Sequence, residues 1–469
     1  MDSLIQMSQG TLCKQSRKWR VGMLSLGCPK TLVDSELILG KLDRERFSLV
    51  PSVAECDIAL VNTCAFIQSA QEESIAAILR LIELKKAGDV CTVIVMGCLP
   101  QRFPKELQRE LKEVDAFVGS GEYASIPQIL KKVSKGERVV EIGVPGYLYT
   151  SAEARISLTP MHSRYVKISE GCDHTCSFCV IPRFRGRHRS RPIEDILREA
   201  EQLVSEGARE LILTGQDTTF FGYDLTGRYL LPELLSRLSG ISHLRWIRVL
   251  YAYPSLVSNE LIESIANLEK VCHYLDMPLQ HISDKILRSM RRGTSCNSTR
   301  RLIEKLRRRI PDLAIRTTFI VGYPGETETE FKELLSFLAE ARFERLGIFT
   351  YSKEEGSLAN SLPGQVAEGV KDRRLEEAML LQQSISRANN RRAIGNVLDV
   401  LLEEYNSDQK LWAGRTYMDA PEVDGAVFVK TSPSLHDRIK PGAGIFLKTR
   451  ITDTHEYDLI GEALEISPA

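Results

Sequence analysis

Three cysteines stand close together near the middle of the chain. Cys172, Cys176 and Cys179 form a CxxxCxxC spacing inside the stretch Glu-Gly-Cys-Asp-His-Thr-Cys-Ser-Phe-Cys. Thiolates suit iron–sulfur clusters, and three of them on one loop leave the fourth iron of a four-iron cluster open to a cofactor or substrate. The alternative is a zinc loop with His174 as its fourth ligand. Because His174 lies between two of the proposed ligands, it is badly placed to complete a tetrahedron, and the spacing favours the cluster.

A second set of cysteines shares a position relative to expected strands. Each of the three follows an apolar run: Cys28 after 21–26, Cys64 after 58–61 and Cys98 after 92–96. The carboxyl ends of parallel strands meet at one edge of a sheet, where α/β proteins collect ligands, so these thiolates can converge on a second cluster with an open iron. The alternative is that each is a small buried apolar residue, as free cysteine often is. The shared position, with Gly27 and Gly97 directly ahead of two of them, favours the cluster.

The remaining cysteines follow no such pattern, and we assign them no role. They are Cys13, Cys56, Cys91, Cys272 and Cys296.

Bulk composition limits the class of protein. The 469 residues exceed one ordinary core, and a hydrophobic share of 43% with a charged share of 26% is typical of a soluble globular protein. No apolar run approaches the length of a membrane span, and eleven cysteines without an export signal predict free thiols in the cytoplasm. The 62 basic and 62 acidic residues cancel, so the whole chain shows no electrostatic preference for nucleic acid or membrane.

The cysteines must be positioned by a chain of several domains. Strand-like and helical runs alternate over residues 20–145, which predicts an N-terminal parallel α/β sheet domain behind a flexible leader at 1–19. Residues 146–160 read as a linker. A second alternating series over 161–392 predicts a partial (β/α) barrel with its active site at the carboxyl ends of the strands. Short strands and turns over 394–466 predict a small antiparallel β-barrel.

These features together resemble a known family. The CxxxCxxC loop with Phe178 before its last cysteine resembles the radical S-adenosylmethionine (SAM) superfamily, and the flanking three-cysteine domain and TRAM-like barrel are similar to the methylthiotransferases. The resemblance runs from residue 20 to about 465. The segments Ser-Leu-Gly-Cys-Pro-Lys-Thr-Leu-Val-Asp-Ser-Glu (25–36), Asn-Thr-Cys-Ala-Phe-Ile (62–67) and Tyr-Leu-Asp-Met-Pro-Leu-Gln-His (274–281) most resemble the protein-modifying branch. The sequence departs from the pattern of this branch at Thr31, where asparagine is common, and at Gly215, where alanine is common.

The resemblance implies an activity. That branch inserts a methylthio group at the β-carbon of an aspartate in the twelfth protein of the small ribosomal subunit. One SAM would bind the cluster at Cys172, Cys176 and Cys179, where a one-electron reductant triggers its cleavage to a radical. A second SAM would methylate sulfur held by the cluster at Cys28, Cys64 and Cys98. Both open irons would have to face one cavity.

The resemblance also implies contacts to SAM. Phe178 would lie near the adenine, although packing within the loop accounts for it equally well. Gly215 and Gln216 would meet the SAM amino group. Gly322 and Pro324 would flank the adenine, or form a plain strand-to-helix turn. Gln280 follows the fourth barrel strand at the active-site end and would join the site, or have a structural role only.

The substrate and partners follow from the same branch and from local charge. Residues 394–469 carry thirteen acidic and seven basic residues, a net charge of −6, which suits a basic ribosomal protein and disfavours RNA binding. Lys30 could pair with the target aspartate, or be a surface lysine. The alternatives are a tRNA adenosine methylthiotransferase and, more distantly, a non-enzymatic iron–sulfur or zinc protein that binds ribosomes.

Arginines at alternating positions follow the CxxxCxxC loop. In an extended segment they would share one face and could bind carboxylate or phosphate, whereas the alternative is that they pair with Glu194 or Asp195. These residues are Arg183, Arg185, Arg187, Arg189 and Arg191.

Overall fold

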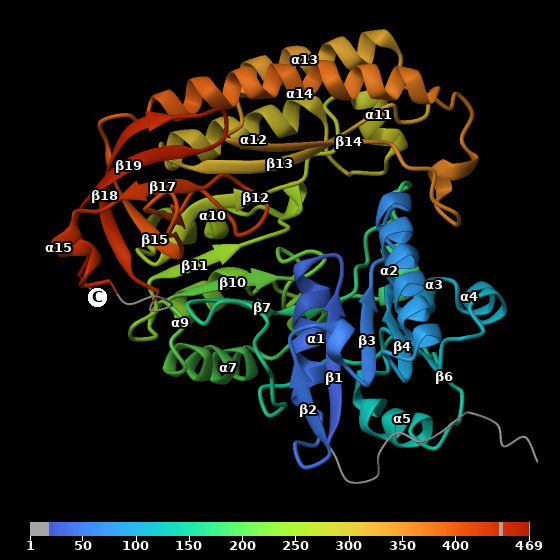
Figure 1. Cartoon of the computed structure of the whole chain (residues 1–469). Coiled ribbons are helices and arrows are strands. Elements are labelled where there is room, and N and C mark those ends of the chain that lie inside the picture. The colour runs from blue at the N-terminus through green and yellow to red at the C-terminus, as the bar shows by residue number, and fades with distance from the viewer. Residues whose placement is uncertain (1–17, 440–443, 469) are drawn as a thin grey trace, which may run out of the picture. The chain divides into compact units, whose positions relative to one another are not determined.

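The structure, a computed structural model, describes residues 18–439 and 444–468 (Figure 1). Cys13 and nearly all of the predicted leader lie outside this range. The described residues form two compact units, one made of residues 18–65 and 69–147 and the other of residues 66–68, 148–439 and 444–468. The division at 147/148 falls inside the segment predicted as a linker. Within the described ranges, no helix is long and apolar enough to cross a membrane.

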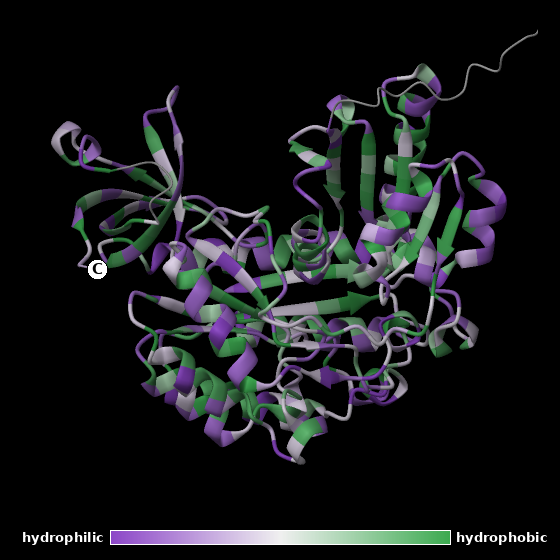
Figure 2. Ribbon diagram, turned by 90° about the horizontal axis from the view of Figure 1, so that it is seen from below, coloured by the Kyte–Doolittle hydropathy of each residue, from purple (hydrophilic) through white to green (hydrophobic). Residues whose placement is uncertain are grey.

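The first unit is built on a parallel sheet of six strands in the order β2-β1-β3-β4-β5-β6. Its central strands are the apolar runs seen in the sequence, and Figure 2 shows hydrophobic residues along them. The short strands β2 and β6 at the two edges were not predicted. The strands are β1 (Trp19–Ser25), β2 (Phe47–Val50), β3 (Ile58–Thr63), β4 (Thr92–Gly97), β5 (Ala116–Gly119) and β6 (Val139–Glu141). The helices are α1 (Pro29–Gly40), α2 (Gln68–Ala87), α3 (Cys98–Arg102), α4 (Pro104–Glu110) and α5 (Ile126–Val133).

The second unit contains the predicted partial barrel. Six parallel strands follow the order β14-β13-β12-β11-β10-β7 and do not close, so β7 and β14 are the edges. Its core contains a large apolar cluster that includes Ile247, Leu275 and Phe319. The strands are β7 (Ser163–Lys167), β10 (Glu210–Thr214), β11 (Trp246–Val249), β12 (Val271–Asp276), β13 (Ala314–Val321) and β14 (Arg345–Thr350). The main helices are α7 (Ile193–Ser205), α9 (Leu231–Ser239), α10 (Asn259–Asn267), α12 (Cys296–Arg309), α13 (Glu328–Ala341) and α14 (Glu368–Arg391).

Short elements fill the loops of this unit. A two-stranded pair, β8 (Ser169–Glu170) with β9 (Arg189–Ser190), brackets the CxxxCxxC loop. The other short helices are α6 (Ile181–Arg185), α8 (Tyr223–Thr226), α11 (Asp284–Ser289) and α15 (Pro433–His436).

The C-terminal strands close a barrel in the order β15-β16-β17-β19-β18. Four of the five pairings are antiparallel as predicted, but β17 and β19 pair in parallel. A parallel pair cannot be joined by a hairpin, and here α15 and β18 form the crossover. The strands are β15 (Val397–Asn406), β16 (Leu411–Arg415), β17 (Val427–Lys430), β18 (Phe446–Thr454) and β19 (Leu459–Ile466).

The closed barrel is fixed to the partial barrel by buried charges. Glu210, at the start of β10, is fully buried and accepts hydrogen bonds from Arg415 at 2.7 Å and from Arg248 at 2.9 Å. Asp419 accepts a hydrogen bond at 2.8 Å from Arg345, which is the first residue of β14. Two of the thirteen C-terminal carboxylates, Asp419 and Asp424, therefore face inward, and the net charge of −6 overstates the charge offered to a partner.

Candidate functional site

The three predicted ligands of the first unit lie on adjacent strands. Cys64 and Cys98 directly follow β3 and β4, which pair through Thr63 and Gly97. Cys28 comes three residues after β1, which pairs with β3 through Ser25 and Asn62. A side chain at Gly27 would place its Cβ 2.7 Å from Cys64 Cβ, so the chain ahead of Cys28 passes directly over Cys64. The fold therefore brings the three cysteines to one sheet edge, as the sequence predicts.

Helix starts support thiolates at this edge. Cys28 is the N-cap of α1, and Cys98 is the first residue of α3. Backbone N–H groups at a helix start favour negative charge beside them. The Cys28 sulfur also lies 3.5 Å from Thr31 Oγ1, so the departure at position 31 still offers a hydrogen-bonding group. Lys30 is 8% exposed and is not the surface lysine that the alternative expected.

The CxxxCxxC loop of the second unit is held at both ends. Cys172 N–H donates to Gly186 O at 3.1 Å, and Ser177 N–H donates to Met290 O at 3.0 Å. Gly171 has a φ of +80°, and a Cβ there would lie 2.0 Å from Arg187 O, so the entry to the loop requires glycine. The backbone thus fixes where the three thiols point.

Burial makes two thiols of this loop harder to ionise. It raises the pKa of Cys172 and of Cys179 to about 12. A thiol in such a place is protonated at neutral pH and becomes a thiolate when metal displaces its proton. The Cys172 and Cys179 sulfurs each interact electrostatically with Cys176, so the three thiols are neighbours. This donor set fits a cluster of soft irons.

His174 does not serve as a fourth ligand. Its Nε2 lies 2.6 Å from Asp217 Oδ2, and its ring stacks on Tyr253 with centroids 3.7 Å apart. Among the described residues, no three cysteine, histidine or acidic side chains lie close enough to share one metal ion. A cubane places each thiolate on a different iron and so does not need the tight ligand set of a single zinc. The geometry argues against the zinc alternative.

Gln216 has an oriented side chain at the carboxyl end of β10. Its Nε2 donates to Glu170 Oε1 at 2.7 Å, and because a carboxylate only accepts, the amide oxygen must face the other way. That oxygen is buried without a hydrogen-bond partner in the structure, as is Ser169 Oγ, which lies 2.6 Å from where a Cβ on Gly215 would be. Two buried acceptors with no donor fit the ammonium group of SAM.

Glu170 was missed in the sequence. Burial alone would raise the pKa of Glu170, but Lys167 at 2.8 Å and Arg185 at 3.3 Å hold that pKa well below its usual range. The carboxylate is therefore ionised and fixes Gln216. Its position directly before Gly171 gave no periodic signal that could have separated it from an ordinary surface glutamate.

The surroundings of the other predicted SAM contacts differ in whether they favour a binding role or a structural role. Phe178 packs against the apolar cluster of Ile286, Met290, Tyr323, Tyr351 and Ala359, which favours its packing role. Gln280 has a φ of +71° just beyond β12, a strained conformation often found at functional sites. Gly322 has a φ of +72° and donates its N–H to Glu326 at 3.0 Å, and Pro324 is buried in the same turn. These roles stay predictions.

The alternating arginines do not share a face. Arg191 pairs with Asp195 at 2.6 Å and Arg185 with Glu170, whereas Arg187 is exposed. Helix α6 interrupts the extended segment that the alternation assumed. Arg191 forms the ion pair with Asp195 that the alternative expected, but it is fully buried and not solvated.

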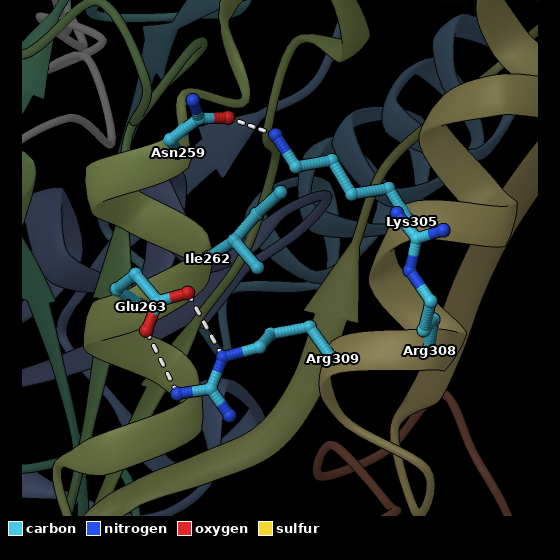
Figure 3. Close-up of a pocket in the computed structure, with 6 residues that line it drawn as sticks. All are labelled: Asn259, Ile262, Glu263, Lys305, Arg308 and Arg309. Atoms are coloured by element: carbon cyan, nitrogen blue, oxygen red, sulfur yellow. Dashed lines mark hydrogen bonds and ion pairs between the residues drawn. The ribbon is translucent and has the colours of Figure 1, made fainter.

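A surface hollow of about 310 Å³ between α10 and α12 contains none of the predicted site residues (Figure 3). Arg309 pairs there with Glu263 at 2.7 Å, and Lys305 binds Asn259. Its basic side chains are thus partly neutralised on the surface.

The remaining scattered cysteines have structural surroundings. Cys56 and Cys272 are buried, Cys91 is exposed, and Cys296 begins α12. None of them lies in the two cysteine groups.

Comparisons with known proteins cover nearly the whole chain. Residues 20–119 match the uncharacterized protein family UPF0004, residues 166–338 the radical SAM superfamily and residues 394–464 the TRAM domain. The ribosomal protein uS12 methylthiotransferase RimO of Pelotomaculum thermopropionicum is 46% identical, over 95% of this chain and 99% of its own length. The enzyme of the same name from Thermoanaerobacter sp. (strain X514) is 46% identical, over 94% and 99%.

A solved structure shares the fold. The radical SAM methyltransferase TsrM of Kitasatospora setae matches 71% of this chain and 73% of its own with a TM-score of 0.51 at 14% identity.

Proposed function

We propose a role for each cysteine group on the premise that this chain belongs to the family of ribosomal protein uS12 methylthiotransferases, which it matches at 46% identity over nearly its full length. The protein is a radical SAM methylthiotransferase that acts on ribosomal protein uS12. Its cofactors are two four-iron four-sulfur clusters and SAM. The observation that carries this conclusion is the identity, which spans all three domains.

Cys172, Cys176 and Cys179 would hold the cluster that binds SAM, and Cys28, Cys64 and Cys98 the second cluster. When bound, the first cluster with SAM supplies the radical that activates the substrate carbon, and the second supplies the sulfur. The chain's own contribution is positioning. The CxxxCxxC loop and the ends of β1, β3 and β4 hold the six cysteines, Glu170 orients Gln216, and the buried acceptors beside Gly215 would receive the SAM ammonium.

The finer assignments also belong to this proposal. We infer that the modified atom is the β-carbon of an aspartate, that a one-electron reductant is a partner, and that the enzyme works in the cytoplasm. The cysteines assigned to the clusters must be reduced to bind iron, which supports a reducing compartment. Phe178, Gln280, Gly322 and Pro324 remain the proposed outer contacts of SAM.

The substrate is tested by offering two candidates separately. Reconstituted enzyme with SAM and reductant is incubated with isolated uS12 and with unmodified transfer RNA, and each product is weighed by mass spectrometry. We expect the mass of one methylthio group on an aspartate peptide of uS12 and none on the RNA. A gain on the RNA alone would overturn the substrate assignment.

A further inference from the structure

Arg292 lies behind one of the proposed cluster ligands. Its Nη1 donates to Cys176 Sγ at 3.5 Å, and its Nη2 donates to Pro278 O at 2.7 Å. The side chain is buried, and the whole residue is 5% exposed. The residue follows α11, 116 positions away from Cys176 in the sequence. One end of the guanidinium is thus held by the backbone, and the other end points at a thiol.

The charge of Arg292 has no carboxylate to balance it. Five other buried arginines in this unit are each paired with an acidic side chain: Arg185 with Glu170, Arg191 with Asp195, Arg248 with Glu210, Arg345 with Asp419 and Arg374 with Glu326. Within residues 18–439 and 444–468, no aspartate or glutamate pairs with Arg292. A buried unpaired cation is costly, so an anion is expected beside it.

Aromatic rings fix the guanidinium in place. The Arg292 guanidinium carbon lies 4.2 Å from the centroid of the Tyr253 ring, and His174 stacks on the same ring at 3.7 Å. Two groups this close to one centroid cannot share a face, so Tyr253 lies between them. Tyr253 Oη also donates to Arg292 O at 2.6 Å. Asp217 hydrogen-bonds to the His174 ring. The stacked groups therefore connect the CxxxCxxC loop to the segment that follows α11.

We propose that Arg292 is a positioning residue that donates a hydrogen bond and a positive charge to the Cys176 thiolate and so makes the SAM-binding cluster easier to reduce. The missing counter-anion of Arg292 is then the thiolate-ligated cluster itself. Hydrogen bonds to cluster sulfurs and nearby charge set reduction potentials, and a cation stabilises the more negative, reduced state. The inference rests on the assignment of Cys172, Cys176 and Cys179 to that cluster.

The test measures a midpoint potential instead of turnover. Cys28, Cys64 and Cys98 are all changed to alanine in the full chain, so that a single cluster remains, and the reduced cluster is followed by electron paramagnetic resonance during a redox titration without SAM. In this background Arg292→Gln should lower the midpoint potential of the remaining cluster. At a fixed solution potential, the ratio of reduced to oxidised cluster should fall about tenfold, which corresponds to a midpoint shift of about 59 mV for one electron. Arg292→Lys, which keeps the charge, should shift it less.

The matched control is Arg291→Gln. Arg291 is the exposed neighbour and should leave the potential unchanged. An unchanged potential in Arg292→Gln, with iron content intact, overturns the proposal, and so does weaker SAM binding without a change in potential. Loss of the cluster in both Arg292 variants would show a role in folding only and would also overturn it. If the triple alanine protein itself binds no iron, the cluster assignment fails, and that result is separate from any effect of Arg292.

Discussion

Arg415 of the C-terminal barrel donates to Glu210 of the partial barrel at 2.7 Å, and both side chains are almost completely buried. Arg248 shares the same carboxylate. Glu210 is the first residue of β10, at the end of the partial barrel opposite the CxxxCxxC loop. These buried ion pairs therefore hold the C-terminal barrel in a fixed position against the partial barrel.

Removing this carboxylate should destabilise the protein strongly. Glu210→Gln leaves the buried Arg248 without its anion and leaves Arg415 with Glu403 alone, and breaking a buried pair in this way costs about 3 kcal/mol. Chemical unfolding followed by circular dichroism would show an earlier transition. Glu194→Gln, which removes the exposed partner of Arg237, is the matched control and should unfold like the parent. Equal stability of the two variants would contradict the docking role.

The contribution of Glu210 should also depend on pH. Burial alone would raise the pKa of Glu210, but Arg415 and Arg248 lower it to about 2, below its ordinary value of 4.5. A lowered folded-state pKa stabilises the folded protein above about pH 4.5, and this stability is lost as the pH falls towards 2. The difference in unfolding free energy between parent and Glu210→Gln should therefore shrink below pH 4.5, by up to about 1.4 kcal/mol per pH unit. A constant difference would contradict the assigned charge state.

Alanine substitutions in the two cysteine groups should affect different steps of the reaction. Cys176→Ala should abolish reductive cleavage of SAM, measured as deoxyadenosine release, because it removes a proposed ligand of the SAM-binding cluster. Cys64→Ala should retain that cleavage but stop methylthio transfer. Iron analysis provides the control, with about eight irons in the parent and about four when either whole triplet is alanine. Methylthiolated uS12 from the Cys64→Ala enzyme would show that the assignment of the sulfur-donating cluster is wrong.

A single added methyl group should disrupt the SAM-binding loop. Gly171→Ala combines a φ of +80° with a Cβ 2.0 Å from Arg187 O, so the loop must move and its cluster should be lost. Gly227→Ala has a similar φ of +73° but meets nothing within 4 Å, so it should cost only about 1 kcal/mol and keep both clusters. Iron content and absorbance of the two reconstituted variants distinguish these outcomes. Full iron in Gly171→Ala would disprove the steric argument.

The sequence by itself determined which cysteines lie close to one another. Each of the six stands at a position defined by local pattern: a fixed spacing on one loop, or the end of a strand. Strands place such residues at a predictable edge, since the carboxyl ends of parallel strands meet there. The partial barrel was confirmed for the same reason, as its alternating runs are local signals. The parallel β17–β19 pairing was missed because strand direction depends on a crossover that no local pattern records.

Only the tertiary structure decided which polar residues surround those cysteines. Arg292 and Cys176 are 116 residues apart, and Arg415 and Glu210 are 205 residues apart. Such pairs form because packing brings distant elements together and because a buried charge must find a partner or an anion. A run of arginines looks alike in the sequence whether it is solvated or buried. The fold made Arg191 an ion-pair partner, left Arg187 exposed and aimed Arg292 at a sulfur.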